Sequence, residues 1–215
     1  MIRLYFQALW HKDDFQKAFQ LIAEHDMFQD EEIKRLIEEA YGLHHIIHNA
    51  KPLDVFRYPY PNTRVVLDPL HTISRHDVHF VEQLFEPLIR FDMELQQAVS
   101  NLAQAVGSDD EGLRFHDGSA VTSQDVAATL RRAVNRGRMF VTIERITMQD
   151  DGSLAIQLKE CNYLFPRILC SPKLSIVPFR WIEDGEIGIP AGAGPFRLAS
   201  QTDTLIKLEW MPTGK

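Results

Sequence analysis

The sequence predicts an α+β protein, with an N-terminal αα-hairpin followed by a lobe built on a mixed sheet. Three observations support this class. Residues 15–41 contain two apolar patterns with helical spacing, residues 113–126 join an extended run to a turn and a helix start, and residues 141–158 contain two alternating runs separated by Asp151-Gly152. Helices and strands are interspersed without a regular βαβ repeat, which favours α+β over a doubly wound α/β fold.

Residues 1–50 are predicted to form a helical linker segment. Apolar side chains recur in two stretches at the i, i+3, i+4 and i+7 spacing of an amphipathic helix. The connection over residues 25–30 is short and Asp30 can cap the second helix, so the two helices should form an antiparallel αα-hairpin. The apolar positions are Phe15, Ala18, Phe19, Ile22 and Ala23 in the first helix, and Ile33, Leu36, Ile37, Ala40 and Tyr41 in the second.

After residue 50 the pattern changes to mixed helices and strands. Residues 53–55 and 64–67 predict two short strands, because apolar and β-branched residues dominate them. Residues 74–85 predict a helix. Ser74 is placed as its N-cap and Asp77 follows three residues later, which is the spacing of a capping box.

The most informative stretch of the chain begins at residue 113. Leu113 and Phe115 alternate with polar neighbours as in a short strand. The strand is predicted to run into a tight turn, because glycine takes the positive φ that other residues resist. The four residues of this strand-to-turn signature are Phe115, His116, Asp117 and Gly118.

A helix is predicted directly after this turn. Thr122 reads as its N-cap, with a hydroxyl that accepts from the backbone N–H of Asp125 while the Asp125 carboxylate reaches back. The carboxylate also places negative charge at the positive end of the helix dipole. The apolar stripe of this helix consists of Val126, Leu130, Ala133 and Val134.

Two hairpins are predicted in the C-terminal half. Residues 141–148 and 154–158 flank an Asp-Gly turn, and a slip in the apolar alternation of the first strand predicts a β-bulge at Glu144-Arg145. Residues 196–198 and 206–210 alternate in the same way and predict a terminal hairpin.

These segments together resemble the family 5 extracellular solute-binding proteins, which include the oligopeptide- and dipeptide-binding receptors of ABC importers. The stretch from Phe115 to Val126 resembles the family's FHDG segment and the T-x-x-D-V that follows it. Other matching pieces occur in the family's order: Leu67-Asp68-Pro69, the run from Val81 to Asp92, and Gly192-Ala193-Gly194-Pro195-Phe196. The resemblance implies that residues 51–215 form a partial solute-binding domain, the first lobe of a type II periplasmic binding protein, and it gives these motifs a role in the fold.

Two departures from the family pattern accompany this resemblance. Residues 103–113 are too short for the extra strand that the family places before its FHDG segment. The family fold has two lobes, and the chain is expected to supply only the first. A helical segment followed by such a lobe resembles the cytoplasmic transcriptional regulators of the SgrR type, in which a winged-helix domain, a helical linker and a solute-binding domain follow one another. DNA binding is therefore expected only through a domain outside this chain.

The resemblance also implies where a ligand would bind. The family holds solute in the cleft between its lobes, against backbone near the first strands and the glycine-rich turn. Carried over by position, the ligand-binding residues are Tyr58, Asp68, Gly192 and Gly194. The expected ligand is a peptide or another small molecule, with no cofactor. The alternative is that the chain is a fragment of the oligopeptide-binding receptor of an ABC importer. Homo-oligomerisation is left open.

Composition narrows the function further. The formal net charge of −7 disfavours nucleic acid as a direct partner, because phosphate backbones bind clustered Lys and Arg. Arg131, Arg132, Arg136 and Arg138 do cluster, but they are interpreted as cations at a helix C-terminus. The first residues contain no uninterrupted apolar run of the kind found in signal peptides, and no run reaches the length of a membrane span. The chain as given is therefore expected in the cytoplasm.

Histidine is the residue type that leaves an enzymatic alternative open. His44, His45 and His48 include an i, i+4 pair that could bind a metal from one helix face, and His76 and His79 are spaced i, i+3. No HExxH motif accompanies them, and nucleophile motifs such as G-x-S-x-G are absent from the sequence. We therefore expect neither a metal site nor an enzyme. A metal-dependent hydrolase, the remaining alternative, would require stoichiometric zinc in the purified chain.

Overall fold

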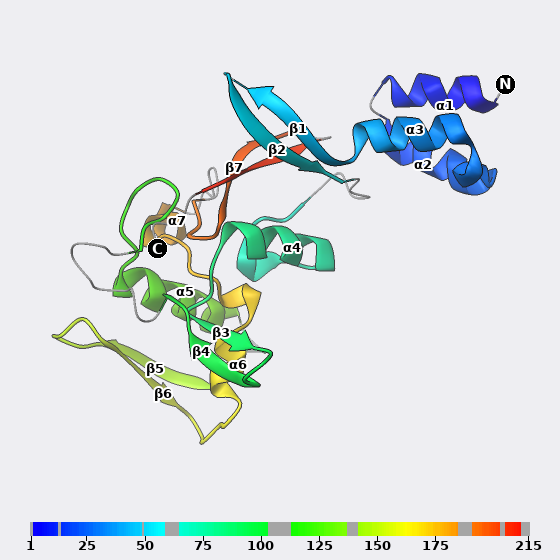
Figure 1. Ribbon diagram of the computed structural model, residues 1–215. Coiled ribbons are helices and arrows are strands. Elements are labelled where there is room, and N and C mark those ends of the chain that lie inside the picture. The colour runs from blue at the N-terminus through cyan, green and yellow to red at the C-terminus, as the bar shows by residue number, and fades with distance from the viewer. Residues whose placement is uncertain are drawn as a thin grey trace. The chain divides into compact units, whose positions relative to one another are not determined.

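The computed structural model describes residues 2–12, 14–48, 50–58, 65–102, 113–136, 142–184, 191–202 and 205–211. The chain divides into two compact units, Met1–Arg64 (unit 1) and Val65–Lys215 (unit 2). Helices alternate with two-stranded sheets, and each of the four described sheets is an antiparallel hairpin (Figure 1). This arrangement confirms the predicted α+β class.

Unit 1 begins with three α-helices, α1 (Ile2–Trp10), α2 (Phe15–Glu24) and α3 (Glu31–Ala40), with the short 3₁₀ helix η1 (Met27–Gln29) before α3. Helices α2 and α3 are the predicted pair. The Asp30 carboxylate caps α3, because it accepts from the amides of Glu32 and Ile33 at 3.1 and 3.4 Å. Helix α1 was not predicted from the sequence.

Trp10 explains why α1 belongs to this unit. Its ring lies 5.3 Å from that of Phe6 and 5.1 Å from that of Phe15, measured between centroids, and Phe19 and Tyr41 also contact it. Aromatic pairs at such distances stabilise a core beyond the area that they bury. The buried side chains of this core are Phe6, Leu9, Trp10, Ala18, Ile22 and Ile33.

The strands β1 (Gly42–His48) and β2 (Lys51–Arg57) complete the described part of unit 1. They pair antiparallel, with His45 opposite Asp54. Strand β2 contains the predicted strand at residues 53–55, whereas β1 was not predicted. Residue 50, the border that the sequence suggests between the helical segment and the lobe, lies in the turn of this hairpin, and the two compact units divide between Arg64 and Val65.

Unit 2 opens with the 3₁₀ helix η2 (Pro69–His71) and α4 (Arg75–Leu84). The capping box of α4 is present as predicted: Ser74 Oγ accepts from the Asp77 amide at 3.1 Å, and Asp77 accepts from the Ser74 amide at 2.9 Å. The strand predicted at residues 64–67 is wrong over its described part. The Val66 amide donates to Asp77 Oδ1 at 3.0 Å, so a side chain replaces the partner strand.

The middle of unit 2 contains β3 (Ile89–Asp92), β4 (Gln97–Ser100), α5 (Ser123–Arg136), β5 (Ile143–Met148) and β6 (Leu154–Leu158). Helix α5 lies between the β5–β6 hairpin and α7 (Phe179–Asp184), and it contacts both (Figure 1). The predicted bulge in β5 is confirmed as a register shift between Ile143 and Arg145. Residues 113–115 form a single bridge, Arg114 with Ala120, instead of the predicted strand. The chain turns back at once, because the Phe115 amide donates to the carbonyl oxygen of Ser119 at 2.8 Å.

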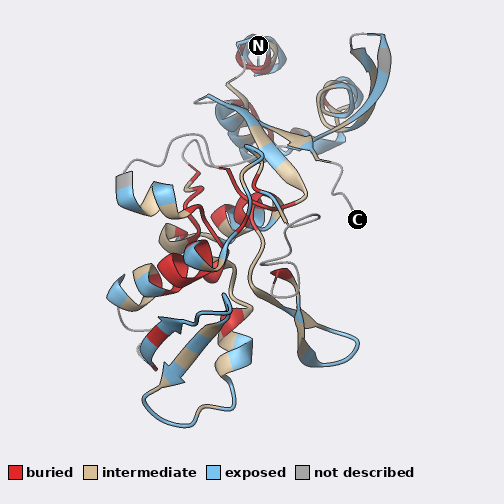
Figure 2. Cartoon of the chain, turned by 90° about the vertical axis from the view of Figure 1, so that its left-hand side faces the viewer, coloured by how far each residue is buried: buried red, intermediate tan, exposed pale blue. Residues whose placement is uncertain are grey.

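The core of unit 2 gathers around α5 (Figure 2). Val126, Leu130 and Ala133 are each about 1% exposed, as the predicted apolar stripe requires. The N-terminus of α5 has the predicted cap: the Thr122 hydroxyl accepts from the Asp125 amide at 3.4 Å, and the Thr122 amide donates to Asp125 Oδ2 at 2.7 Å. The Thr122 hydroxyl also donates to this Oδ2 at 2.6 Å. The other oxygen, Asp125 Oδ1, accepts from the Phe179 amide at 2.6 Å, so the cap also holds the start of α7.

The C-terminal part adds α6 (Phe165–Leu169), the 3₁₀ helix η4 (Pro172–Leu174), α7 and the hairpin of β7 (Phe196–Gln201) with β8 (Ile206–Trp210). This hairpin is the predicted terminal one. The buried hydroxyl of Thr129 on α5 accepts from the Val177 amide at 3.2 Å and fixes the segment between η4 and α7. Over the described residues, no helix combines the length and the apolar character that crossing a bilayer requires.

Candidate functional site

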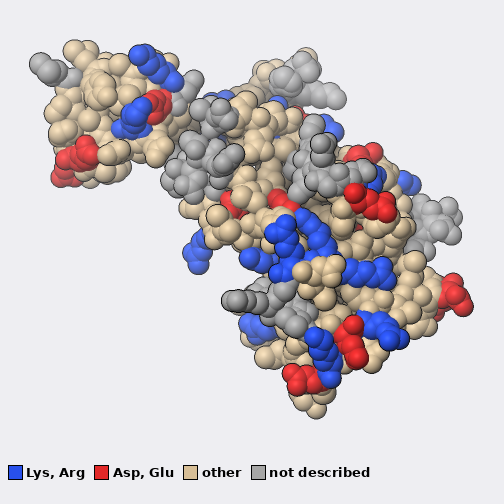
Figure 3. All heavy atoms as spheres, turned by 180° about the vertical axis from the view of Figure 1, so that it is seen from behind, with Lys and Arg blue, Asp and Glu red and all other residues tan. Residues whose placement is uncertain are grey.

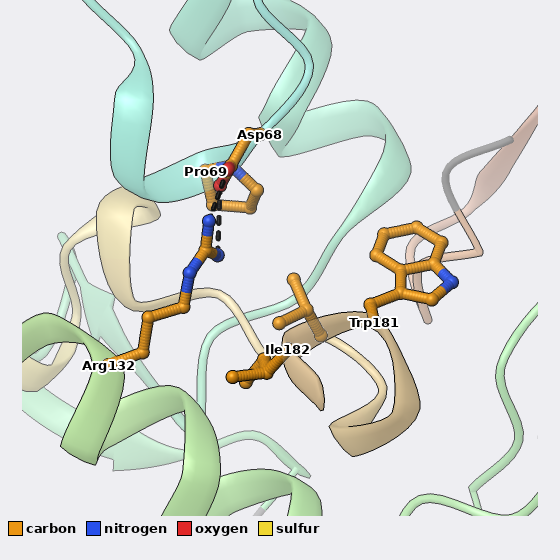
Figure 4. A pocket seen from close by; sticks show the side chains of 6 residues that line it. Asp68, Pro69, Arg132, Trp181 and Ile182 are labelled. Carbon is orange, nitrogen blue, oxygen red and sulfur yellow. Dashed lines mark hydrogen bonds and ion pairs between the residues drawn. The ribbon is translucent and has the colours of Figure 1, made fainter. Parts of the chain in front are cut away.

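Asp68 is predicted to bind ligand, and the structure surrounds it with partners from unit 2. Arg132 on α5 forms a bidentate ion pair with its carboxylate, with Nη1 3.0 Å from Oδ1 and Nη2 in contact with Oδ2 (Figure 4). His71 Nδ1 lies 2.5 Å from the same Oδ2, and the Leu70 amide donates to Oδ1 at 3.1 Å. The Asp68 carboxylate is therefore fully engaged within the protein.

These partners set the protonation state of Asp68. Its side chain is 6% exposed, and such burial raises the pKa of a carboxyl group. The hydrogen bonds from Arg132 and His71, together with the positive charge of Arg132, outweigh this effect and hold the pKa of Asp68 below its ordinary value. The carboxylate thus stays ionised at neutral pH and ties η2 to α5.

A narrow pocket lies beside this ion pair. Its inner volume is about 10 Å³, which is at the lower limit for one water molecule. Arg132 reaches into it from α5, and Trp181 and Ile182 approach from α7 (Figure 4). A space of this size cannot hold a peptide or a sugar, so the Asp68–Arg132 pair forms a structural joint.

Gly192 and Gly194, also predicted to bind ligand, lie buried against the C-terminal end of α4. A Cβ atom on Gly192 would stand 1.8 Å from the carbonyl oxygen of Leu84, and one on Gly194 would stand 2.5 Å from that of Gln83. The Gly194 amide donates to Leu84 O at 3.0 Å. The backbone approaches so closely that only glycine fits at these two positions.

His116 also contacts these two glycines, which lie in residues 191–194, a stretch that we call the glycine segment. Its amide donates to Gly192 O at 2.8 Å, and its Nε2 lies 2.9 Å from Gly194 O, which makes Nε2 the protonated nitrogen. Burial lowers the pKa of His116, and the charge of Arg197 lowers it further, although the hydrogen bond to Gly194 opposes both. The imidazole is therefore neutral at pH 7 and links two motifs that lie far apart in the sequence.

A larger pocket opens next to this contact. Its volume is about 240 Å³, and four segments of unit 2 line it: the turn after Phe115, α7, the start of the glycine segment, and β7. This space, which we call the Arg197 pocket, is the candidate ligand site of the described chain. Its lining residues are His116, Asp117, Arg180, Trp181, Ala191, Arg197 and Leu198.

Charged side chains of both signs surround the Arg197 pocket. Arg180 forms an ion pair with Asp117 and donates to the Ser119 hydroxyl at 3.2 Å. Arg197 donates to Glu209 Oε2 through Nε at 3.3 Å and through Nη2 at 2.9 Å. The pocket lining contains two arginines and one carboxylate, so it can recognise charged groups on a small solute.

The remaining predicted ligand residue, Tyr58, belongs to unit 1. It follows β2, is 41% exposed, and its ring lies 6.0 Å from that of Phe56. The structure therefore brings Gly192 and Gly194 together with His116, places Asp68 in a separate joint of unit 2, and leaves Tyr58 in the other compact unit.

The histidine hypothesis needs a correction. Residues 42–48 form β1, so His44, His45 and His48 do not lie on one helix face as predicted. His45 Nδ1 instead contacts Asp54 Oδ1 on β2 at 2.6 Å. Within the described ranges, no group of three or more His, Cys, Asp or Glu side chains is arranged to hold a metal ion.

Sequence reasoning missed the arginine and tryptophan residues of both pockets. Arg132 was interpreted as a cation at a helix end, yet Asp125, Thr129 and Arg132 recur at i, i+4 and i+7, a spacing that places polar side chains on one helix face. This pattern could have marked Arg132 as an internal contact. For Arg180, Trp181 and Arg197 we find no local sequence signal, because their neighbourhood arises from distant segments.

Comparison with known proteins agrees with this architecture. Residues 110–211 match the family model of the bacterial extracellular solute-binding proteins, family 5 Middle. The chain carries a family 5 solute-binding segment. The family 5 segment covers the helix α5, the hairpin β5–β6, and the glycine segment that His116 contacts. The resemblance inferred from sequence motifs is thereby confirmed.

Three curated relatives show how far the similarity extends. The Bacillus subtilis protein YhjP is 30% identical over 163 residues, covering 69% of this chain and 28% of the relative. The HTH-type transcriptional regulator SgrR of Photorhabdus laumondii is 25% identical over 205 residues, covering 89% of the chain and 35% of the relative. The glutathione-binding protein GsiB of Pectobacterium atrosepticum is 29% identical over 169 residues, covering 69% and 32%. The chain thus spans about a third of the length of these relatives.

Solved structures give the same fold. The binding protein AgaA from A. tumefaciens R10, solved with agropinic acid, superposes with a TM-score of 0.59 at 24% identity, over 68% of this chain and 34% of AgaA. A nickel ABC transporter protein from Bacillus halodurans superposes with a TM-score of 0.54 at 27% identity, over 67% of this chain and 32% of that protein. The family 5 segment therefore adopts the fold of periplasmic binding proteins, as predicted.

Proposed function

We propose that this chain is part of a non-catalytic solute-binding module, the sensor of a cytoplasmic SgrR-like transcriptional regulator. The solute is a peptide or another small molecule, and residues 51–215 supply the first lobe of the binding domain. Residues 1–50 act as the helical linker toward a DNA-binding domain outside this chain.

The extent of the match to SgrR carries this proposal. The match to SgrR covers 89% of this chain, which is more than the residues of unit 2. The similarity therefore continues into the helical unit 1. The match to GsiB covers 69% of the chain, and the solved binding proteins cover about two thirds, which unit 2 alone can contain. This chain is thus similar to a regulator over more of its length than to an importer receptor, and the additional part includes helical residues of unit 1.

The proposed mechanism is a shift between conformations. A solute bound between two lobes stabilises their closed arrangement, and the closed state biases the attached DNA-binding domain. The shift can be only as large as the difference in solute affinity between the two states; moving an equilibrium from 1:99 to 99:1 needs about 10⁴-fold tighter binding to one of them.

An ABC-importer receptor is the second candidate function. The match to GsiB and the fold shared with the nickel transporter protein favour it. The gene sequence on both sides of this segment separates the two candidates. An upstream winged helix would support the regulator, whereas an upstream export signal with a lipoprotein cysteine would support the receptor.

Solute binding itself is tested by calorimetry on the 215-residue chain. A first lobe supplies only one wall of a cleft, so dipeptides, glutathione and sugar phosphates should bind weakly, in the millimolar range, to this chain and more tightly to the complete protein. Micromolar binding of one of these solutes to the chain alone would contradict the one-lobe proposal. Turnover of a bound solute would contradict the non-catalytic role.

A further inference from the structure

The Arg197 pocket contains a guanidinium group that is only partly used. Glu209 Oε2 accepts hydrogen bonds from Nε and Nη2 of Arg197, and Glu209 Oε1 lies 3.2 Å from Lys207 Nζ. One carboxylate therefore serves two cations on the β7–β8 hairpin, which leaves one positive charge in excess. Among the described residues, Arg197 Nη1 has no acceptor, and Arg197 is about half exposed.

The other charges of the pocket do not cancel this excess. Arg180 and Asp117 neutralise each other in their ion pair, and Arg180 is held further by the Ser119 hydroxyl. His116 is neutral and uses Nε2 to bind Gly194 O. Arg197 is therefore the cation of this pocket lining that can receive an anionic group.

The rest of the lining suits the body of a small solute. Trp181 on α7 and Leu198 on β7 give the pocket apolar walls, and the Trp181 ring is oriented by an edge contact with Phe85 at 6.2 Å between centroids. The volume of about 240 Å³ is smaller than the range of roughly 300–1,000 Å³ that whole ligands usually occupy, so one end of a solute fits.

We propose that the Arg197 pocket binds the carboxylate end of the solute, with Arg197 as the residue that selects for the negative charge. This inference rests on the proposed solute-binding function and names the chemical group that this wall of the site recognises. The chain as a whole is acidic, although Figure 3 shows Lys and Arg side chains gathered on one face of unit 2. Recognition of an anion must therefore come from local cations such as Arg197 rather than from the overall charge.

Two small molecules that differ only in the charged group test this inference. The 215-residue chain, labelled with ¹⁵N at its tryptophan indoles, is titrated with N-acetylglycine and with N-acetylglycinamide at constant ionic strength. Trp181 reports on the pocket, and Trp10 serves as the internal reference because it lies in unit 1 and does not line the pocket. We expect a saturable shift of the Trp181 signal with the acid and at least about tenfold weaker binding of the amide, since a charge-assisted hydrogen bond is lost.

Variants assign the effect to one side chain. Arg197→Gln should weaken acid binding about tenfold and remove the preference for the acid, whereas Arg197→Lys should retain part of it. Glu209→Gln should strengthen acid binding, because it frees the guanidinium from its competitor. Arg145→Gln, on the exposed side of β5, removes the same charge outside the pocket and should leave binding unchanged.

The outcomes separate the two proposals. If acid and amide shift Trp181 equally, or if Arg197→Gln binds the acid like the unchanged chain, the carboxylate assignment is wrong while solute binding at this wall stands. If neither compound shifts Trp181 but dipeptides bind by calorimetry, the pocket is wrong and the solute-binding function stands. If no solute binds by either method, both proposals fail.

Discussion

Arg132 and Asp68 lie 64 residues apart in the sequence and form a bidentate ion pair inside unit 2. The carboxylate of Asp68 is 6% exposed and the side chain of Arg132 is 21% exposed, so water can replace neither partner fully. The pair connects η2, at the start of the lobe, with the central helix α5. Its integrity should therefore be measurable as global stability.

Replacing Arg132 with methionine should destabilise the chain by about 3 kcal/mol, because the buried Asp68 carboxylate would lose its counter-ion. Urea unfolding followed by circular dichroism measures this change. Arg136→Met on the same helix is the matched control, since Arg136 is exposed, and it should cost less than about 1 kcal/mol. A smaller loss for Arg132→Met than for Arg136→Met would show that the ion pair does not stabilise the lobe.

Stability should fall in acid, and Asp68 should contribute to the loss. The pKa of Asp68 is lower in the folded chain than in the unfolded chain, because Arg132 and His71 outweigh the effect of burial. The unfolded state therefore binds the proton first, and the stabilisation is complete above about pH 4 and is lost as the pH falls through the folded pKa. Urea unfolding at a series of pH values should give a shallower acid slope for Asp68→Asn than for the unchanged chain; equal slopes would argue against this role.

The glycine segment should tolerate no side chain at its closest contact. Gly192→Ala places a methyl group 1.8 Å from the Leu84 carbonyl oxygen, and backbone cannot move aside as a flexible side chain can, so we expect a loss of about 3 kcal/mol. Gly152→Ala is the control, because a Cβ there meets nothing within 4 Å and only its positive φ of 79° opposes the change. That variant should lose about 1 kcal/mol. Similar losses for both would refute the packing argument.

Asp125 should matter more than an ordinary helix cap. Thr122→Ala removes one capping hydroxyl, which costs about 1 kcal/mol. Asp125→Ala removes the reciprocal cap and also leaves the amide of Phe179 without its 2.6 Å acceptor, so the loss should reach about 2–3 kcal/mol. Thermal unfolding of the two variants compares them directly. If Thr122→Ala lost as much stability as Asp125→Ala, the link from α5 to α7 would be unimportant.

Local patterns in the sequence were enough for several elements. The caps at Ser74 and Thr122, the bulge in β5 and the stripe of α5 depend on residues within a few positions of one another, and the sequence predicts them for that reason. The α+β class and the family 5 motifs follow from the same short-range information. Helix α1 and strand β1 were missed, because each owes its place to partners that local periodicity does not reveal: Trp10 packs on α2, and β1 pairs with β2.

The candidate site was decided by tertiary structure. The sequence pointed to Asp68, Gly192 and Gly194, but it could not show that Arg132 holds the first or that the end of α4 packs against the other two. Arg180 and Arg197 came into one pocket only through the folding of α7 and β7 around the turn at His116. The sequence alone determined the similarity to family 5, and with it the caps, the bulge and the apolar stripe of α5, because these depend on neighbouring residues. Which polar groups meet depends on contacts between distant residues, and these exist only once the apolar core around α5 has formed.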